Sequence, residues 1–173
     1  MGQYLIANGP MPTTAAQAAV TTGTAIKTML QAKLGANSNQ PAKVVEWGIS
    51  FDGSAAATPI KCELLTTGAI GATITEFLAA DIINLSDPNA AAVTDDFPLA
   101  FTAAGDESGY TATAEGSIVA TRMFDIQFIA PTNQYVKQFP LGREPQFKAS
   151  EFCRIRVTAG TAVNCYCYMV LEI

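Results

Sequence analysis

Histidine is absent from this sequence of 173 residues, and its absence restricts the chemistry that the chain can perform. Ser-His-Asp and Cys-His catalysis need an imidazole, and so do histidine zinc sites and histidine proton shuttles. Any catalysis would have to use carboxylates, lysine or tyrosine. Glu46, Asp125 and Glu151 are available for a carboxylate pair, but no spacing pattern marks them as one. We therefore expect a protein that is not an enzyme and that holds no cofactor.

Charge is scarce as well, since charged residues make up 14% of the chain, and the formal net charge is −5. Such sparse charge is a poor way to keep a free monomer soluble, so we expect partner molecules to cover part of the surface. The chain has no cluster of lysine and arginine that would neutralise phosphate groups. This lack argues against nucleic acid as a partner.

Long apolar runs are missing too, because none approaches the roughly 20 residues that a membrane span requires. The first residues, MGQYLIANGPMP, have neither the positive charge nor the apolar length of a secretory signal. We therefore expect a protein that is made in the cytoplasm and has no membrane partner.

The residues that are present favour β-structure. Segments of alternating or continuous apolar character recur at short intervals, and turns rich in glycine and proline separate them. No long helical pattern alternates with these segments, although residues 24–34 fit either a helix or a strand. The pattern predicts an all-β sandwich, for which we expect a jelly-roll topology. The expected strands are 42–51, 59–65, 116–129, 134–139, 151–157 and 163–173.

A chain of this length suits one domain. We divide it into an extended N-terminal arm, residues 1–12, and a single β-sandwich domain, residues 13–173. Two prolines favour extended backbone in the arm, whose apolar part is Tyr4, Leu5 and Ile6. Such an arm would add to a neighbouring molecule, while a frayed terminus is the other interpretation.

The last expected strand holds Cys165 and Cys167 one residue apart. In an extended strand this spacing separates the two thiols by about 7 Å, which is too far for a disulfide and awkward for one metal ion. A hairpin turn at 158–161 would place Cys153 opposite this strand and gather three thiols on one face. Because zinc sites normally use four ligands and C-x₂₋₄-C spacing, we interpret the cysteines as small buried apolar residues and expect no metal.

Three stretches together resemble a known group of proteins. They are VVEWGISFDGSAAATPIKCELL (44–65), TATAEGSIVATRMFDIQFIAPTNQYVKQFPLGREPQ (111–146) and SEFCRIRVTAGTAVNCYCYMVLEI (150–173). They are similar to capsid decoration, or cement, proteins of tailed bacteriophages, which have the jelly-roll fold. The resemblance implies a virion structural protein on the outer capsid surface. It also implies a homotrimer that binds the major capsid protein and locks its subunits together without any chemistry.

The candidate interface residues come from three places in the sequence. Trp47 could anchor an interface, although core packing within its strand is the alternative. Arg143 and Glu144, in the proline-bounded segment PLGREP, could pair across a subunit boundary or could lie in a plain turn. Tyr4, Leu5 and Ile6 of the arm complete the set. The alternative function is a receptor-binding or carbohydrate-binding β-sandwich module of a phage tail, which would need exposed aromatic rings.

Overall fold

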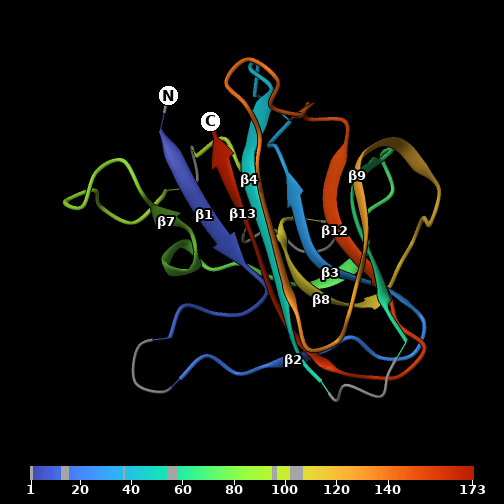
Figure 1. Cartoon of the computed structure of the whole chain (residues 1–173). Coiled ribbons are helices and arrows are strands. Elements are labelled where there is room, and N and C mark those ends of the chain that lie inside the picture. Colours follow the sequence, from blue (N-terminus) through green and yellow to red (C-terminus); the bar gives the residue numbers. More distant parts are fainter. Residues whose placement is uncertain (1, 13–15, 37, 54–57, 95–96, 102–106) are drawn as a thin grey trace.

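The fold is a sandwich of two antiparallel β-sheets (Figure 1), as the sequence predicts. It is seen in a computed structural model of the chain. The structure describes residues 2–12, 16–36, 38–53, 58–94, 97–101 and 107–173. Apolar side chains from both sheets form one continuous core between them.

The first sheet has seven strands, and its main path runs in the order β10-β4-β13-β1-β7. Two short strands lie off this path, because β11 pairs with β4 and β2 pairs with β13. The central pair, β4 and β13, contributes most of this sheet's core residues. The strand bounds are β1 (Gln3–Ala7), β2 (Val20–Thr21), β4 (Ala42–Asp52), β7 (Ile83–Asn84), β10 (Gln134–Gln138), β11 (Gln146–Phe147) and β13 (Asn164–Glu172).

The second sheet has six strands in the order β6-β8-β3-β12-β5-β9. Residues 26–33, which the sequence left open between helix and strand, form β3. The strand bounds are β3 (Ile26–Lys33), β5 (Ile60–Thr67), β6 (Thr73–Glu76), β8 (Gly109–Ala114), β9 (Ala120–Ile129) and β12 (Phe152–Thr158). The 3₁₀ helix η1 (Ala79–Asp81) follows β6, and no helix in the described part of the chain is long and apolar enough to cross a membrane.

The first strand differs from the predicted arm. Residues 3–7 form β1, which lies between β13 and β7 of the same chain, with Gln3 opposite Glu172 and Ala7 opposite Tyr168. The backbone N–H of Gly2 also donates to the carbonyl of Ile173 at 2.9 Å. A strand with two partners in its own sheet is part of the sandwich body, so the division at residue 12 is not seen.

The predicted hairpin between the last two long strands is also wrong. Residues 159–163 carry the chain from β12 in the six-stranded sheet to β13 in the seven-stranded sheet, so these strands do not pair. Cys153 is instead opposite Ala32 of β3 and Thr66 of β5. Its Sγ lies 4.0 Å from Sδ of Met169, which belongs to the opposite sheet. The two sulfur atoms therefore meet across the core.

The apolar face of β9, which its alternating pattern suggests should be buried, instead points to the solvent. Ile126 and Phe128 face outward and are exposed, whereas Asp125, the residue before Ile126, is buried. The pairing with β5 shifts register between Leu64 and Leu65, which marks a bulge near the middle of the strand. As a result, an apolar stripe that resembles a core face lies on the surface of an edge strand.

Candidate functional site

Asp125 is the most heavily bonded carboxylate described, and it lies between the two sheets where β9 meets β10. Its Oδ2 accepts hydrogen bonds from Trp47 Nε1 at 3.2 Å and from the Tyr135 hydroxyl at 3.0 Å. Its Oδ1 accepts one from Gln127 Nε2 at 2.9 Å and lies 3.3 Å from Lys137 Nζ. These partners come from β4, β9 and β10, so one carboxylate joins both sheets.

The partners of Asp125 explain its protonation behaviour. Burial by itself would raise the pKa of Asp125, but the hydrogen bonds from Gln127 and Tyr135 and the charge of Lys137 outweigh it and lower the pKa. Conversely, burial and the Asp125 carboxylate raise the pKa of the Tyr135 phenol to about 12. Each oxygen of the carboxylate is occupied by donors within the protein. The group therefore forms a structural link between the two sheets.

The other two carboxylates considered for catalysis are held in separate contacts. Glu46 Oε1 accepts a hydrogen bond from the Tyr168 hydroxyl at 2.6 Å, on the outer face of the seven-stranded sheet. Glu151 Oε2 lies 2.7 Å from Nη2 of Arg122. Because Glu46, Glu151 and Asp125 each have different local partners, the structure does not bring them together as a catalytic pair.

Two buried arginines on β12 fasten a surface loop onto the outer face of the six-stranded sheet. Arg154 donates to the carbonyls of Ile70, Glu115 and Ser117 at 2.6–3.1 Å. Gly116 makes this close packing possible, because its φ is +62° and a side chain there would collide with the carbonyl of the 70–71 loop. The guanidinium thus replaces water for carbonyls of two loops, 68–72 and 115–119, and positions both loops.

The second arginine extends this arrangement toward β9. Nε of Arg156 lies 3.1 Å from Glu63 Oε2, and both side chains are almost fully buried. Nη1 of Arg156 donates to the carbonyl of Ile118 at 2.7 Å, and Lys61 Nζ contacts the other Glu63 oxygen at 3.0 Å. A buried pair of this kind fixes the position of the segment above it, because breaking it would leave an uncompensated charge.

The four cysteines are free and buried, as the sequence analysis interprets them. Burial raises the pKa values of Cys62 and Cys153 to about 12 and raises that of Cys167 strongly. Thiols with such pKa values are protonated near neutral pH, and they are poor nucleophiles and poor metal ligands in that state. Among the described residues, no group of three or more His, Cys, Asp or Glu side chains could hold a metal ion.

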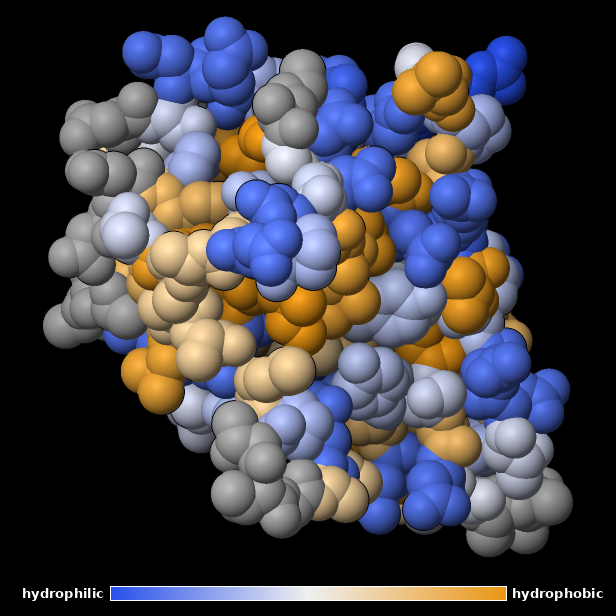
Figure 2. Space-filling model, turned by 90° about the vertical axis from the view of Figure 1, so that its left-hand side faces the viewer, coloured by the Kyte–Doolittle hydropathy of each residue, from blue (hydrophilic) through white to orange (hydrophobic). Residues whose placement is uncertain are grey.

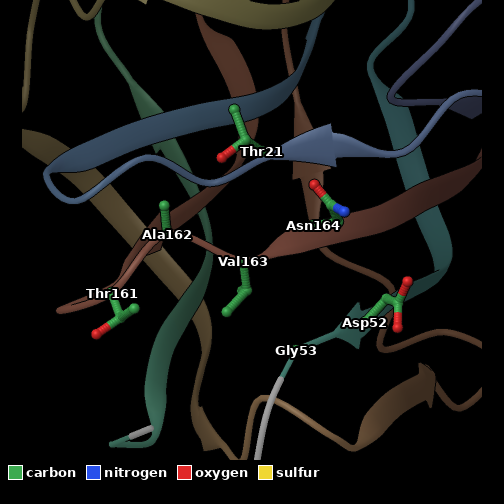
Figure 3. Close-up of a pocket in the computed structure, with 7 residues that line it drawn as sticks. All are labelled: Thr21, Asp52, Gly53, Thr161, Ala162, Val163 and Asn164. Atoms are coloured by element: carbon green, nitrogen blue, oxygen red, sulfur yellow. The ribbon is translucent and has the colours of Figure 1, made fainter.

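A depression in the surface lies where β2 and β4 end and β13 begins (Figure 3). It has a volume of about 460 Å³ and is lined by small side chains, as the close-up shows. Asp52 is its one charged residue. A single exposed carboxylate among threonine, alanine and asparagine supplies neither a nucleophile with a base nor a set of metal ligands. The lining residues are Thr21, Asp52, Gly53, Thr161, Ala162, Val163 and Asn164.

The predicted interface residues are distributed differently from expectation. Trp47 is fully buried in the core and hydrogen-bonded to Asp125, so the alternative of core packing is the correct one. Ile6 is fully buried as well, while Tyr4 packs its ring against Phe97 at 4.6 Å between centroids. Leu5 is partly buried. Trp47 and Ile6 therefore offer no free surface, and Tyr4 and Leu5 offer only part of theirs.

Arg143 and Glu144 do lie at the surface, in the loop that follows β10. The backbone N–H of Arg143 donates to the carbonyl of Pro140, and Glu144 accepts from the N–H of Gly142 at 2.8 Å. The loop is therefore a closed turn, and Glu144 is used within it. Leu141 at its tip is 94% exposed, which the sequence analysis did not single out. The sequence signal for an exposed loop tip was a leucine beside Gly142 in a segment between two prolines.

A larger apolar surface, which the sequence analysis also missed, lies along β9 and the loop that precedes it. We call it the β9 patch, and it consists of Ile118, Val119, Met123, Ile126 and Phe128, all substantially exposed. Together these side chains expose on the order of 500 Å² of mainly apolar surface, which is near the upper end for a free monomer. In the sequence its apolar residues look like a core face, and no local signal showed that the other face, with Asp125, would be the buried one.

Comparisons of this chain with protein-family models, with curated proteins and with solved structures find no match.

Proposed function

We propose that this chain is a non-enzymatic structural protein of a virus particle. In this proposal it binds the outer surface of a phage capsid, contacts the major capsid protein and associates with itself as a homotrimer. Two lines support the proposal: the resemblance of the three stretches between residues 44 and 173 to jelly-roll decoration proteins, and the amount of apolar surface that the chain exposes. We keep the jelly roll as the expected topology of the sandwich.

The exposed apolar surface is the observation that carries the proposal. The β9 patch and Leu141 together place six large apolar side chains in water. Removing such area from water is favourable at about 25 cal/mol per Å², so these surfaces gain most when a partner covers them. A protein that acts by covering its neighbours needs this kind of surface and needs no reactive group.

The loop between Pro140 and Pro145 is the part that we assign to the capsid. It projects Leu141 and Arg143 from the body, and the internal hydrogen bonds of the turn hold it in one shape. A pre-ordered loop loses little conformational entropy on binding, which favours affinity. An apolar tip beside a cation suits an apolar depression with an acidic rim on the shell.

Co-sedimentation with empty expanded capsids tests the proposal. We expect the wild-type chain to sediment with the particles at a fixed ratio, and the double variant Leu141→Asp with Arg143→Glu to bind at least tenfold more weakly. Lys27→Glu, a charge change on β3 away from the loop, is the matched control and should bind like the wild type. Failure of the wild-type chain to bind capsids, together with its absence from purified particles, would contradict the proposal.

A tail module that binds carbohydrate is the second candidate, and a pair of tyrosines favours it. Tyr166 is partly exposed on the outer face of β13, and its ring lies 6.3 Å from that of Tyr168. The ring of Tyr168 covers Gly48, where any side chain would collide with it. Aromatic rings on an open sheet face are suited to stacking on sugars. Binding to a glycan array that Tyr166→Ala abolishes, without capsid binding, would favour this candidate.

A further inference from the structure

The β9 patch is one continuous surface, although its residues come from a strand and a loop. Ile126 and Phe128 lie on the same face of β9, because side chains two apart in a strand point the same way. Ile126 is directly opposite Glu63, which binds Arg156, and Arg156 in turn holds the carbonyl of Ile118. The loop residues therefore lie beside the strand residues over the same part of the sheet.

Three cations lie near this patch. Lys61 is directly opposite Phe128, Arg122 precedes Met123 on β9, and Lys137 lies on β10. Between 33% and 45% of each of these three side chains is exposed. Their acidic partners are more deeply buried than they are, with Glu63 and Asp125 nearly inaccessible. An approaching molecule therefore meets the positive groups first, although the chain as a whole is negatively charged.

The opposite side of the sandwich carries a second exposed apolar surface. We call it the β7 patch, and it consists of Met11, Leu78 and Leu85. Leu78 is 64% exposed, and the backbone N–H of Met11 donates to Asp81, the last residue of η1, at 2.7 Å. Figure 1 places β7 and β9 on opposite sides of the molecule, and Figure 2 shows apolar groups gathered across the middle of the β7 side.

This second surface has the opposite charge. Residues 70–94 contain Glu76, Asp81 and Asp87 and no lysine or arginine. Glu76 is partly exposed and Asp87 is exposed beyond Leu85, while Asp81 is buried and accepts hydrogen bonds from the N–H groups of Met11 and Leu78. The β7 patch therefore has acidic groups beside it, whereas the β9 patch has basic groups beside it.

We propose that the β9 patch of one copy of this chain binds the β7 patch of a second copy. Charge decides between this head-to-tail contact and a symmetric one. A two-fold contact between two β9 patches would bring Lys61 and Arg122 of both copies together, and like charges across an interface cost free energy. The head-to-tail contact instead sets these basic groups against acidic ones.

The area is also consistent with such a contact. A standard interface buries about 800 Å² on each partner, and the apolar side chains of the β9 patch supply more than half of that area before the charged groups beside it are counted. Because the two patches differ, each copy keeps one unused patch after pairing. The assembly closes into a trimer if each contact turns the chain by about 120°, closes into a larger ring at other rotations that divide a full turn, and otherwise grows as an open chain.

A mixing experiment tests the inference, because head-to-tail contacts complement one another. Light scattering coupled to gel filtration should show that the wild-type chain is oligomeric, and that Phe128→Asp and Leu78→Asp are each at least 100-fold weaker in self-association. Mixing the two variants should restore one contact, between the intact β7 patch of the first and the intact β9 patch of the second. The product should be a one-to-one dimer. High salt should weaken it, since surface charges contribute.

Three outcomes would overturn the inference: a wild-type chain that stays monomeric at 100 µM or thereabouts, a Leu78→Asp variant that associates like the wild type, or a mixture of variants that stays monomeric. Lys27→Glu, on β3 and outside both patches, is the control and should associate normally. Circular dichroism of each variant establishes that it is folded.

This head-to-tail contact rests on the self-association in the proposed function, but the two can be contradicted separately. Monomers that still sediment with capsids would contradict this inference alone, and oligomers that ignore capsids would contradict the proposed function alone.

Discussion

The two lateral sides of this sandwich are closed by different physical means. On the β9–β10 side, the carboxylate of Asp125 receives donors from three strands and joins the sheets electrostatically. On the β6–β7 side, aromatic rings fill the gap. Phe97 contacts Tyr4 of the seven-stranded sheet, and Phe77 contacts Tyr110 of the six-stranded sheet, with centroids 4.6 and 5.6 Å apart.

The two sides should therefore lose stability through different changes. A buried carboxylate with several donors depends on its charge, and its loss leaves every donor without an acceptor at once. Ring packing depends on shape and area, is indifferent to pH, and loses stability in proportion to the volume removed. On the β9–β10 side, the apolar face of β9 stays exposed to solvent, whereas on the β6–β7 side the rings that fill the gap are buried or partly buried.

The largest expected effect is on the polar side. Replacing Asp125 by alanine should lower the free energy of unfolding by about 4 kcal/mol, because Trp47, Tyr135 and Lys137 lose a buried acceptor together. Urea denaturation at pH 7, followed by tryptophan fluorescence, measures this directly. A loss smaller than about 1 kcal/mol would mean that the carboxylate does not join the sheets.

The aromatic side should respond slightly less. Phe77→Ala should cost about 3 kcal/mol, the usual result of removing a fully buried ring. The same loss is expected at pH 7 and at pH 4, because no charge is involved. Leu141→Ala, at a residue that is 94% exposed, is the control and should change stability by less than about 0.5 kcal/mol. A pH-dependent cost for Phe77→Ala would contradict the comparison.

Lowering the pH should reduce the stability contribution of Asp125 on the β9–β10 side but not that of the aromatic side. The pKa of Asp125 is lowered in the folded protein, so its contribution is present above the unfolded pKa of about 4 and is lost as the pH falls through the folded value. The difference in stability between the wild type and Asp125→Asn should therefore shrink below pH 4. Thermal unfolding between pH 2 and 7 gives the measurement. A difference that stays constant over this range would exclude a linked titration at Asp125.

The smallest expected effect concerns the thiols in the core between the two sides. Wild type and the double variant Cys165→Ala with Cys167→Ala should contain the same amount of zinc, close to none, because both thiols are buried and burial raises the pKa of Cys167 well above its usual value. Metal analysis of the purified proteins provides the test. Stoichiometric zinc in the wild type that disappears in the variant would show that the cysteines are ligands.

Much of the strand content was predictable because alternation reports one buried face. Trp47, Ile49 and Phe51 point inward on β4, and Ile60, Cys62 and Leu64 do so on β5, as their spacing predicts. Burial of the cysteines followed from the same pattern. Such local signals identify the strands, but they hold no information on which strand pairs with which.

The errors came from that missing information. The turn after Val157 looks like a hairpin, yet the chain crosses there to the other sheet. The apolar residues of β9 predict an inward face, yet Asp125 on the other face finds donors from β4 and β10, which are remote in sequence from each other. Those partners outweigh the apolar pattern, and no local rule reveals them. The β9 patch was hidden from sequence reasoning for the same reason.

The pairing of β1 with β13 has a consequence for how the protein is made. These strands hold residues as distant as Gln3 and Glu172 side by side, with the two chain ends adjacent in Figure 1. During synthesis β1 must wait beside an unfinished sheet until nearly every other strand has left the ribosome. Its apolar residues are unprotected in that interval, and contacts of such long range form slowly. Although β1 is made before the other strands described here, its place is thus settled last, and a chaperone that holds it would assist the whole chain.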